Sequence, residues 1–217
     1  MLALGLFMVK EIRVDYRDGG RIVIQDDDGP LDLLKDWING AIQKNLIEAN
    51  AMCLSTVGSD GAPRSRMVLL KHINDTEIGF FTNLNSDKAL EIDINKKVAI
   101  TMFWAPLEKQ VRILGTASEF ARDVVSDYHF SRPRLSQIAA YTSTQSKELA
   151  SIEVLDEEFR TTERKYKDKK IPLPNHWGGY KILVESIEYW SGRPSRLHER
   201  VILQSINNEW KKTRLYP

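Results

Sequence analysis

The sequence predicts a mainly β protein with flanking helices, of the α+β class, whose antiparallel sheet closes into a barrel. The first observation is a series of short apolar runs between residues 51 and 117, separated by turn-forming sequences. The second is a set of three more predicted strands after residue 180, which complete the sheet. Because the open edges of an antiparallel sheet invite mispairing, we expect closure into a barrel of about six strands.

The amino-terminal region combines a charged segment with one helix. Residues 1–30 are charged and contain Gly19-Gly20 and the run Asp26–Gly29, so we expect a loosely ordered, flexible segment. Pro30 then suits the first turn of a helix. Apolar residues recur at helical spacing after it, from Leu34 to Ile42, which predicts an amphipathic helix over 31–45.

The middle of the chain predicts a meander of strands with one inserted helix. Gly58-Ser59-Asp60-Gly61 is typical of a hairpin turn between two apolar runs, and Asn74-Asp75 marks another turn. Ser86 can cap a short helix that runs through Ile94. The strands are predicted at 51–57, 64–71, 77–82, 98–104 and 109–117.

A helical region follows the meander, and the last strands come after it. We predict helices over 122–166 with a break near Pro133, since proline interrupts a helix. Strands are predicted at 180–190, 196–204 and 209–215. The expected organisation is therefore a flexible segment at 1–30 and one domain at 31–217, with a small helical subdomain around 122–166.

Composition excludes several classes of partner. The 31 basic and 30 acidic residues nearly cancel, so neither nucleic acid nor a membrane surface is expected as a partner. Cys53 is the single cysteine and lies in an apolar run, which favours a small buried residue over a catalytic thiol. With no disulfide available within the chain, we expect a cytoplasmic protein. The apolar residues before Met8 are too few to span a bilayer, and either Met1 or Met8 could be the start.

Three cations alternate near the carboxyl end, at Arg196, His198 and Arg200. On a strand, this spacing places all three side chains on one face, where like charges repel. An anion on that face would explain the pattern, since Arg suits phosphate or carboxylate and His can move a proton. The alternative is a solvated basic strand that pairs with acids on its neighbour.

Other segments offer further cations and donors. Arg66 and Lys71 lie at the two ends of an apolar strand, and Lys88 begins a helix, whose amino end favours anions. Tyr128, Arg132 and Ser136 recur every four residues around the helix break at Pro133, which suggests a phosphate clamp. Alone, each of these could also be an ordinary surface or strand-end residue.

Several common chemistries find no support in the sequence. The four histidines show no metal-ligand spacing, with each other or with Cys53, so no metal is expected. There is also no phosphate-binding glycine loop, nucleophile elbow or dinucleotide fingerprint.

Taken together, these segments resemble the pyridoxamine 5′-phosphate oxidase family, from about Leu31 to Pro217, with a weaker echo at residues 13–16. The stretches that carry the resemblance are Arg66–Lys71, Phe80–Leu84, Leu107–Val111, Ser131–Arg134 with Ser136-Gln137, Gln145-Ser146, Pro172–Pro174 with Trp177–Gly179, and Arg196–Arg200. The resemblance implies an FMN-binding split barrel and a homodimer with FMN at the subunit interface.

The resemblance also implies roles for individual residues. The positions implied to hold FMN are Arg66, Met67, Val68, Leu69, Leu70, Lys71, Phe81, Thr82, Asp87, Lys88, Gln110, Gln145, Ser146, Trp190 and Arg200. Those implied to hold the phosphorylated pyridine substrate are Lys71, Tyr128, Arg132, Ser136, Arg196, Leu197 and His198, with Arg13 and Tyr16 on a mobile lid. Arg196 and His198 are the implied catalytic pair.

One position departs from the family pattern. The family usually has Ser-Arg-Lys where this chain has Ser86-Asp87-Lys88, and that Arg helps to bind the FMN phosphate. An anion near a dianionic phosphate could cost on the order of 1 kcal/mol when partly screened. We therefore expect weaker FMN retention.

The implied reaction is the FMN-dependent oxidation of pyridoxamine or pyridoxine 5′-phosphate by dioxygen, which gives pyridoxal 5′-phosphate and hydrogen peroxide. Two alternatives remain open from the sequence. One is another split-barrel flavoprotein, such as an NAD(P)H-dependent flavin reductase. The other is a non-catalytic protein that binds FMN or pyridoxal phosphate.

Overall fold

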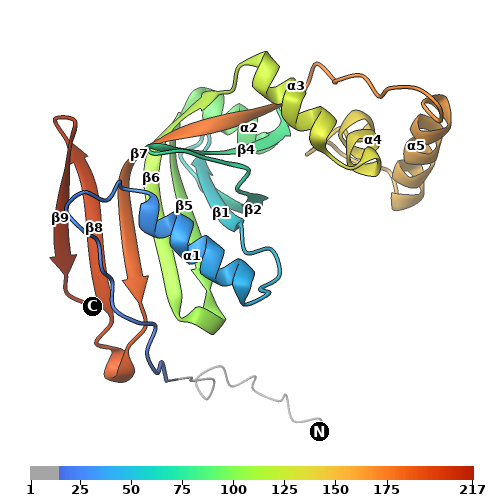
Figure 1. Cartoon of the computed structure of the whole chain (residues 1–217). Coiled ribbons are helices and arrows are strands. Elements are labelled where there is room, and N and C mark those ends of the chain that lie inside the picture. The colour runs from blue at the N-terminus through green and yellow to red at the C-terminus, as the bar shows by residue number, and fades with distance from the viewer. Residues whose placement is uncertain (1–14) are drawn as a thin grey trace, which may run out of the picture.

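One antiparallel sheet organises residues 15–217, the part of the chain that this computed structural model describes (Figure 1). The strands pair in the order β2-β1-β5-β6-β7-β4-β3, and β8 joins the sheet through β7 and carries β9. The strands are β1 (Ala51–Val57), β2 (Pro63–Leu69), β3 (His72–Ile73), β4 (Glu77–Asn83), β5 (Lys97–Trp104), β6 (Lys109–Glu119), β7 (Trp177–Ser191), β8 (Glu199–Ile206) and β9 (Glu209–Leu215).

Five helices accompany this sheet within the described residues: α1 (Asp32–Gln43), α2 (Asp87–Ile94), α3 (Arg122–Ser131), α4 (Arg134–Thr142) and α5 (Ile152–Lys165). Helix α1 buries Leu34, Trp37 and Ala41 against the sheet. The hydroxyl of Tyr189 on β7 fixes its start, because it donates to the carbonyl of Pro30 at 2.8 Å and accepts from the N–H of Leu34 at 3.1 Å.

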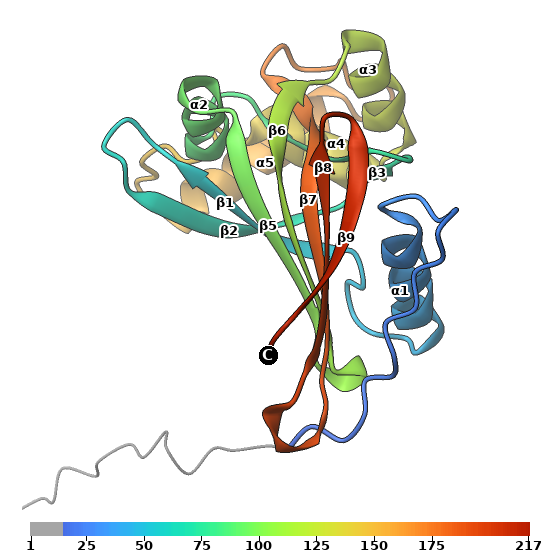
Figure 2. The same ribbon diagram turned by 90° about the vertical axis from the view of Figure 1, so that its left-hand side faces the viewer.

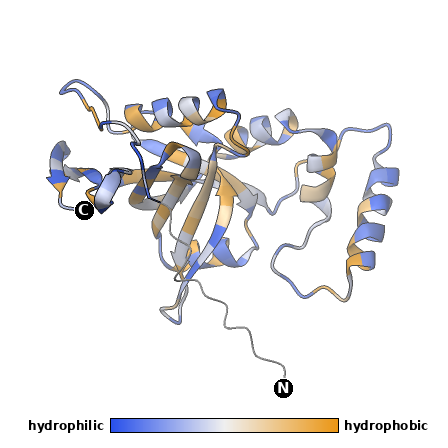
Figure 3. Ribbon diagram, turned by 90° about the horizontal axis from the view of Figure 1, so that it is seen from below, coloured by the Kyte–Doolittle hydropathy of each residue, from blue (hydrophilic) through white to orange (hydrophobic). Residues whose placement is uncertain are grey.

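Alternation of side chains sets the core. Strand β1 buries every second residue, at Met52, Leu54 and Thr56, and pairs with β2 across the turn at 58–61. The hydrophobic colour of Figure 3 concentrates accordingly in the central strands. The sheet curls into a half-barrel, which confirms the predicted mainly β fold with flanking helices.

Strand β7 is the longest element, with 15 residues, and connects most of the sheet. Its first half pairs with β4, its second half with β8, and β6 runs along most of its length. Figure 2 shows β5, β6 and β7 running side by side through most of the height of the molecule. Residues at the two ends of β7 therefore lie in different regions of the protein.

The helical region breaks where proline requires it. Arg132 has φ −72° and ψ 150°, an extended conformation that the following Pro133 imposes, so α3 ends and α4 begins within three residues. Helices α3, α4 and α5 project together from one side of the sheet (Figure 1). None of the helices described by the structure is both long and apolar enough to cross a membrane.

The prediction of a strand over 196–204 was wrong at its start, because β8 begins only at Glu199. Residues Pro194–Arg196 form a short 3-10 turn in which Ser195 and Arg196 have φ of 58° and 61°. Positive φ is incompatible with a strand, so Arg196, His198 and Arg200 do not share one strand face. The short strand β3 was not predicted.

Residues 15–30 contain no helix or strand, yet they lie against the sheet. The N–H of Gly19 donates to the carbonyl of Gly192 at 2.9 Å. Ile22 is 1% exposed, and its N–H donates to the carboxylate of Glu199 at 3.0 Å. The described part of the segment is thus irregular but anchored, and its mobility as a lid stays a prediction.

Candidate functional site

A pocket of about 250 Å³ opens between the end of β2, β4, α2, α3 and the start of β7. Residues from segments far apart in the sequence meet there because β4 pairs with both β3 and β7, and Tyr128 of α3 stacks on Phe81 of β4. The lining residues are Met67, Val68, Leu69, Lys71, Phe81, Thr82, Lys88, Tyr128, Arg132, Gln145 and Trp177. All of these except Trp177 are residues that the sequence assigned to cofactor or substrate.

Lys88 is the most informative residue of this pocket. Its side chain is buried, and its Nζ contacts the Thr82 hydroxyl at 3.3 Å, the Ser86 hydroxyl at 3.1 Å and the Gln145 Oε1 at 3.3 Å. Within residues 15–217, no carboxylate lies within ion-pair distance of it. Burial lowers the pKa of Lys88, and the charge of Arg66 lowers it further. A buried cation with only neutral partners favours an anionic ligand.

Tyr128, in the last turn of α3, and Arg132, which follows the end of this helix, form the opposite wall. The Tyr128 ring stacks on Phe81, with centroids 3.9 Å apart. The guanidinium carbon of Arg132 lies 4.3 Å from the centre of the Trp177 ring. Burial lowers the pKa of Arg132 and raises that of Tyr128. The buried Nη1 of Arg132 finds no hydrogen-bond partner among the described residues.

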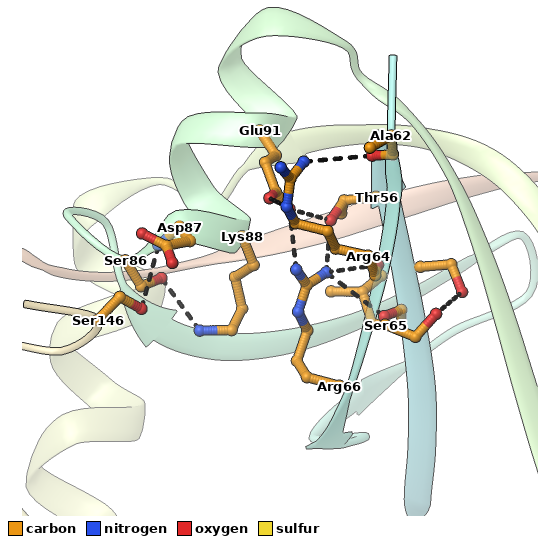
Figure 4. A network of polar contacts seen from close by, with 12 residues as sticks. Thr56, Ala62, Arg64, Ser65, Arg66, Ser86, Asp87, Lys88, Glu91 and Ser146 are labelled. Atoms are coloured by element: carbon orange, nitrogen blue, oxygen red, sulfur yellow. Dashed lines mark hydrogen bonds and ion pairs between the residues drawn. The ribbon is translucent and has the colours of Figure 1, made fainter. Parts of the chain in front are cut away.

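Arg66 lies beside this pocket rather than in its wall. Figure 4 shows its guanidinium between β1 and α2, where Nη2 donates to the Glu91 carboxylate at 2.8 Å and Nη1 to the Thr56 hydroxyl. Thr56 also donates to Glu91, so one buried carboxylate holds both side chains. The positive charge of Arg66 also lowers the pKa of Lys88, so Arg66 contributes to the electrostatics of the pocket without lining it.

Asp87 occupies the first turn of α2, exposed to solvent (Figure 4). Its own N–H donates to the Ser146 hydroxyl at 3.2 Å, which links the start of α2 to the segment after α4. Ser86 precedes the helix as predicted, but its hydroxyl donates to the carbonyl of Asn83 and does not cap the helix.

A second group of predicted residues lies at the other end of β7. The rings of Trp190 and His198 have centroids 4.6 Å apart, and Tyr16 lies 5.2 Å from each of them. Gln110 is the register partner of Trp190 on β6, and Arg200 is its partner on β8. The structure therefore brings Tyr16, Gln110, Trp190, His198 and Arg200 into one neighbourhood.

His198 has a defined tautomer. Its Nδ1 accepts the N–H of Arg193 at 3.1 Å, which leaves the proton of the neutral ring on Nε2. Burial lowers the pKa of His198, and the nearby Arg196 lowers it further. The lowered pKa favours the neutral ring, whose Nε2–H can donate a hydrogen bond.

Arg200 fits the alternative interpretation of the three alternating cations, in which a basic strand pairs with acids on its neighbour. Its Nε pairs with Glu188 on the neighbouring β7 at 2.9 Å, and its Nη1 donates to the carbonyl of Tyr216. Arg112 also approaches Glu188, at 3.6 Å. The ion pair with Glu188 on the neighbouring strand therefore accounts for the charge of Arg200, and no anionic ligand is needed to explain it.

The two groups are too far apart to form one site within one chain. Trp177 in the first group and Trp190 in the second are separated by thirteen positions on the same strand. At about 3.3 Å per residue, an extended strand of this length spans up to roughly 40 Å. The two groups therefore lie towards opposite ends of β7, and a site that uses both is expected to combine two copies of the chain.

The remaining predicted residues lie outside both groups. Leu70 is buried in the core, Leu197 is 64% exposed, and Ser136 does not line the pocket. Arg13 lies outside the described residues. The sequence predicted no role for Trp177 or Glu91. The Trp177-Gly178-Gly179 motif was a signal for Trp177, whereas nothing marked Glu91 as different from other helix acids.

Comparisons with known proteins agree with this geometry. Residues 38–165 match the family described as pyridoxamine 5′-phosphate oxidase, and residues 177–217 match the pyridoxine 5′-phosphate oxidase C-terminal dimerisation region. A pyridoxine/pyridoxamine 5′-phosphate oxidase of Leptospira biflexa is 43% identical over 87% of this chain and 89% of its own. One from Proteus mirabilis is 38% identical over the full length of both chains.

Two solved structures share the fold. PhzG of Burkholderia lata, in complex with tetrahydrophenazine-1-carboxylic acid, superposes with a TM-score of 0.85 at 26% identity and covers 92% of this chain and 100% of its own. A pyridoxamine 5′-phosphate oxidase-related, FMN-binding protein of Nostoc punctiforme has a TM-score of 0.72 at 14% identity, over 88% and 99% of the two chains. The split-barrel fold predicted from the sequence is thereby confirmed.

Proposed function

The chain belongs to the pyridoxine/pyridoxamine 5′-phosphate oxidase family and is an oxidase of these two phosphate esters; from this premise we propose FMN as its cofactor and dioxygen as its final oxidant. When bound, FMN supplies the electron-pair acceptor for oxidation of the substrate 4′ carbon to the aldehyde of pyridoxal 5′-phosphate. The chain's own residues bind, orient and shield the reactants.

The observation that carries the cofactor proposal is the buried ammonium of Lys88. With neutral partners in Thr82, Ser86 and Gln145, it offers its charge to an anion such as the FMN phosphate. The apolar side chains of Met67 and Val68 on β2 offer a surface suited to a flavin ring. The donor set and the pocket therefore fit the cofactor.

The substrate phosphate is proposed to bind Lys71, Tyr128 and Arg132 of the pocket. Ser136, which the family resemblance also implies, does not line it. Arg132, like Lys88, lacks an anionic partner: its guanidinium is half-buried, and no carboxylate within residues 15–217 pairs with it. Binding the phosphate there fixes the ester away from the reacting carbon. This remote binding energy then orients the ring for reaction.

His198 and Arg196 are proposed to act at the reacting end of the substrate. Because the N–H of Arg193 already occupies Nδ1, the neutral His198 would donate a hydrogen bond to the substrate from its Nε2–H. Tyr16 packs on His198 and Trp190 and shields them from water. Arg196 supplies positive charge on the same turn.

We further propose that the active site is shared between two subunits. The first group supplies the phosphate-binding pocket, and the second, with His198, comes from the partner. The C-terminal dimerisation region at 177–217 contains the whole second group except Tyr16 and Gln110, which supports this arrangement.

One assay tests the proposal against its alternatives. Purified protein should show the visible spectrum of bound flavin and form the aldehyde from pyridoxamine 5′-phosphate only when oxygen is present. Consumption of NAD(P)H without aldehyde formation would identify a flavin reductase instead. Bound flavin with neither reaction would identify a non-catalytic binding protein.

A further inference from the structure

The start of β7, Trp177-Gly178-Gly179, lies in the site but has no part in the chemistry proposed so far. Trp177 lines the pocket beside Arg132, and the guanidinium of Arg132 lies over its indole ring at 4.3 Å. A cation over an aromatic face is stabilised by the negative potential of the ring, and tryptophan gives the strongest such contact.

Arg132 depends on this contact to hold its side chain. Its backbone is fixed, since Pro133 follows and its carbonyl accepts from the Gln137 side chain at 2.8 Å. Its guanidinium, in contrast, has no ion-pair partner in the described part of the chain, and Nη1 is buried without a hydrogen bond. The indole face is thus the contact that orients the guanidinium before a ligand arrives.

Trp177 is itself held firmly. Its backbone N–H donates to the carbonyl of Pro174 at 3.1 Å, and its backbone carbonyl accepts from Nη1 of Arg122 at 2.6 Å. Arg122 also donates to the carbonyl of Pro174, at 2.8 Å. Because Arg122 begins α3 and Arg132 follows its end, the helix contacts Trp177 from both of its termini.

The two glycines let β7 approach β4 closely. A Cβ on Gly178 would lie 2.7 Å from the Leu84 side chain, and one on Gly179 would lie 2.5 Å from the carbonyl of Phe80 and 2.7 Å from the Phe81 ring. Phe81 is the residue on which Tyr128 stacks. The motif therefore supports both aromatic surfaces beneath the proposed phosphate clamp.

We propose that Trp177 is a positioning residue that holds the Arg132 guanidinium in place for the phosphate of the substrate; this rests on the proposed function. In this role Trp177 acts through Arg132 and does not itself contact the reacting atoms of the substrate. It predicts a loss of substrate affinity, with the chemical step preserved at saturation.

The test compares Trp177→Leu with Trp177→Phe. Leucine fills space without a ring face, so we expect KM for pyridoxine 5′-phosphate to rise about tenfold, with kcat within about twofold. Phenylalanine keeps a ring face and should keep KM within about threefold of the native value. Trp210→Leu, on β9 and half-buried, is the matched control and should change neither constant. An unchanged KM in Trp177→Leu, or a fall in kcat alone, would overturn the proposal.

A double-mutant cycle with Arg132→Ala keeps the question answerable if Trp177→Leu folds poorly. If Trp177 acts through Arg132, then Trp177→Phe and Trp177→Leu should have less than a twofold effect on KM once Arg132 is alanine. If the Trp177 substitutions raise KM by the same factor with and without the Arg132 side chain, Trp177 does not act through Arg132 and the proposal is wrong. Calorimetric binding of pyridoxal 5′-phosphate, the product, to the FMN-loaded enzyme separates this outcome from failure of the proposed reaction, because the product carries the same phosphate and is not oxidised further.

Discussion

At the scale of single residues, the charge of Lys88 is expected to determine cofactor affinity. Lys88→Gln keeps the hydrogen-bonding length but removes the buried charge, and we expect the Kd for FMN to rise at least about tenfold. Fluorescence titration of apoprotein measures this, with riboflavin as the phosphate-free comparison. Lys97→Gln, which removes an exposed partner of Glu185, is the control. Equal losses for FMN and riboflavin would contradict a phosphate role for Lys88.

His129 predicts a pH dependence of stability. Its side chain is fully buried, and burial, followed by the charges of Arg132 and Arg122, lowers its pKa to about 4. The unfolded chain, with an ordinary histidine near 6.5, then binds more protons than the folded one between these values. Stability should therefore be full above pH 6.5 and fall, by on the order of 2–3 kcal/mol, as the pH drops towards 4.

Urea denaturation at pH 7.5 and pH 4.5 measures this effect, with His129→Leu as the test variant. Both proteins lose stability from other groups in acid, so the prediction concerns the difference between them. The native protein should lose more than the variant. An identical loss in both proteins would show that His129 does not titrate on unfolding.

At the scale of elements, the start of helix α2 is expected to determine how well the phosphate of the proposed FMN cofactor is neutralised. Asp87 suits the helix dipole but places an anion one residue from Lys88. We expect Asp87→Arg to tighten FMN binding about fivefold, which corresponds to about 1 kcal/mol of screened interaction. Titration of apoprotein at low and high salt measures it, and the gain should shrink as salt rises. An unchanged affinity would mean that Asp87 does not face the phosphate.

The elements also show what the sequence could predict. Local signals located the hairpin at Gly58–Gly61, the helix after Pro30 and the break before Pro133, because turn and proline chemistry acts on neighbouring residues. The strand over Arg196 was wrong because the positive φ of Ser195 and Arg196 has no such local signal. Trp177 was missed because its contact with Arg132 joins residues 45 positions apart. The grouping of site residues into two regions likewise follows from strand pairing and not from spacing.

At the scale of the whole molecule, a site shared between subunits predicts complementation between two inactive variants. Arg132→Ala damages the first group and His198→Ala the second. In mixed dimers, one site then carries both defects and the other carries none, so random exchange should restore about a quarter of native activity. The assay is aldehyde formation after denaturation and refolding of a mixture. Each variant refolded alone is the control, and absence of recovery in the mixture would place both groups in one chain.

The length of β7 has a consequence for how this chain can change over time. One strand carries Trp177 at its first position and Trp190 next to its last, so its length sets the separation of the two proposed groups of site residues. Losing or gaining one residue would shift one group by about 3.3 Å and turn every side chain beyond it to the opposite face. Insertions should therefore accumulate in the irregular segment between α4 and α5, while β7 keeps a fixed length among functional descendants.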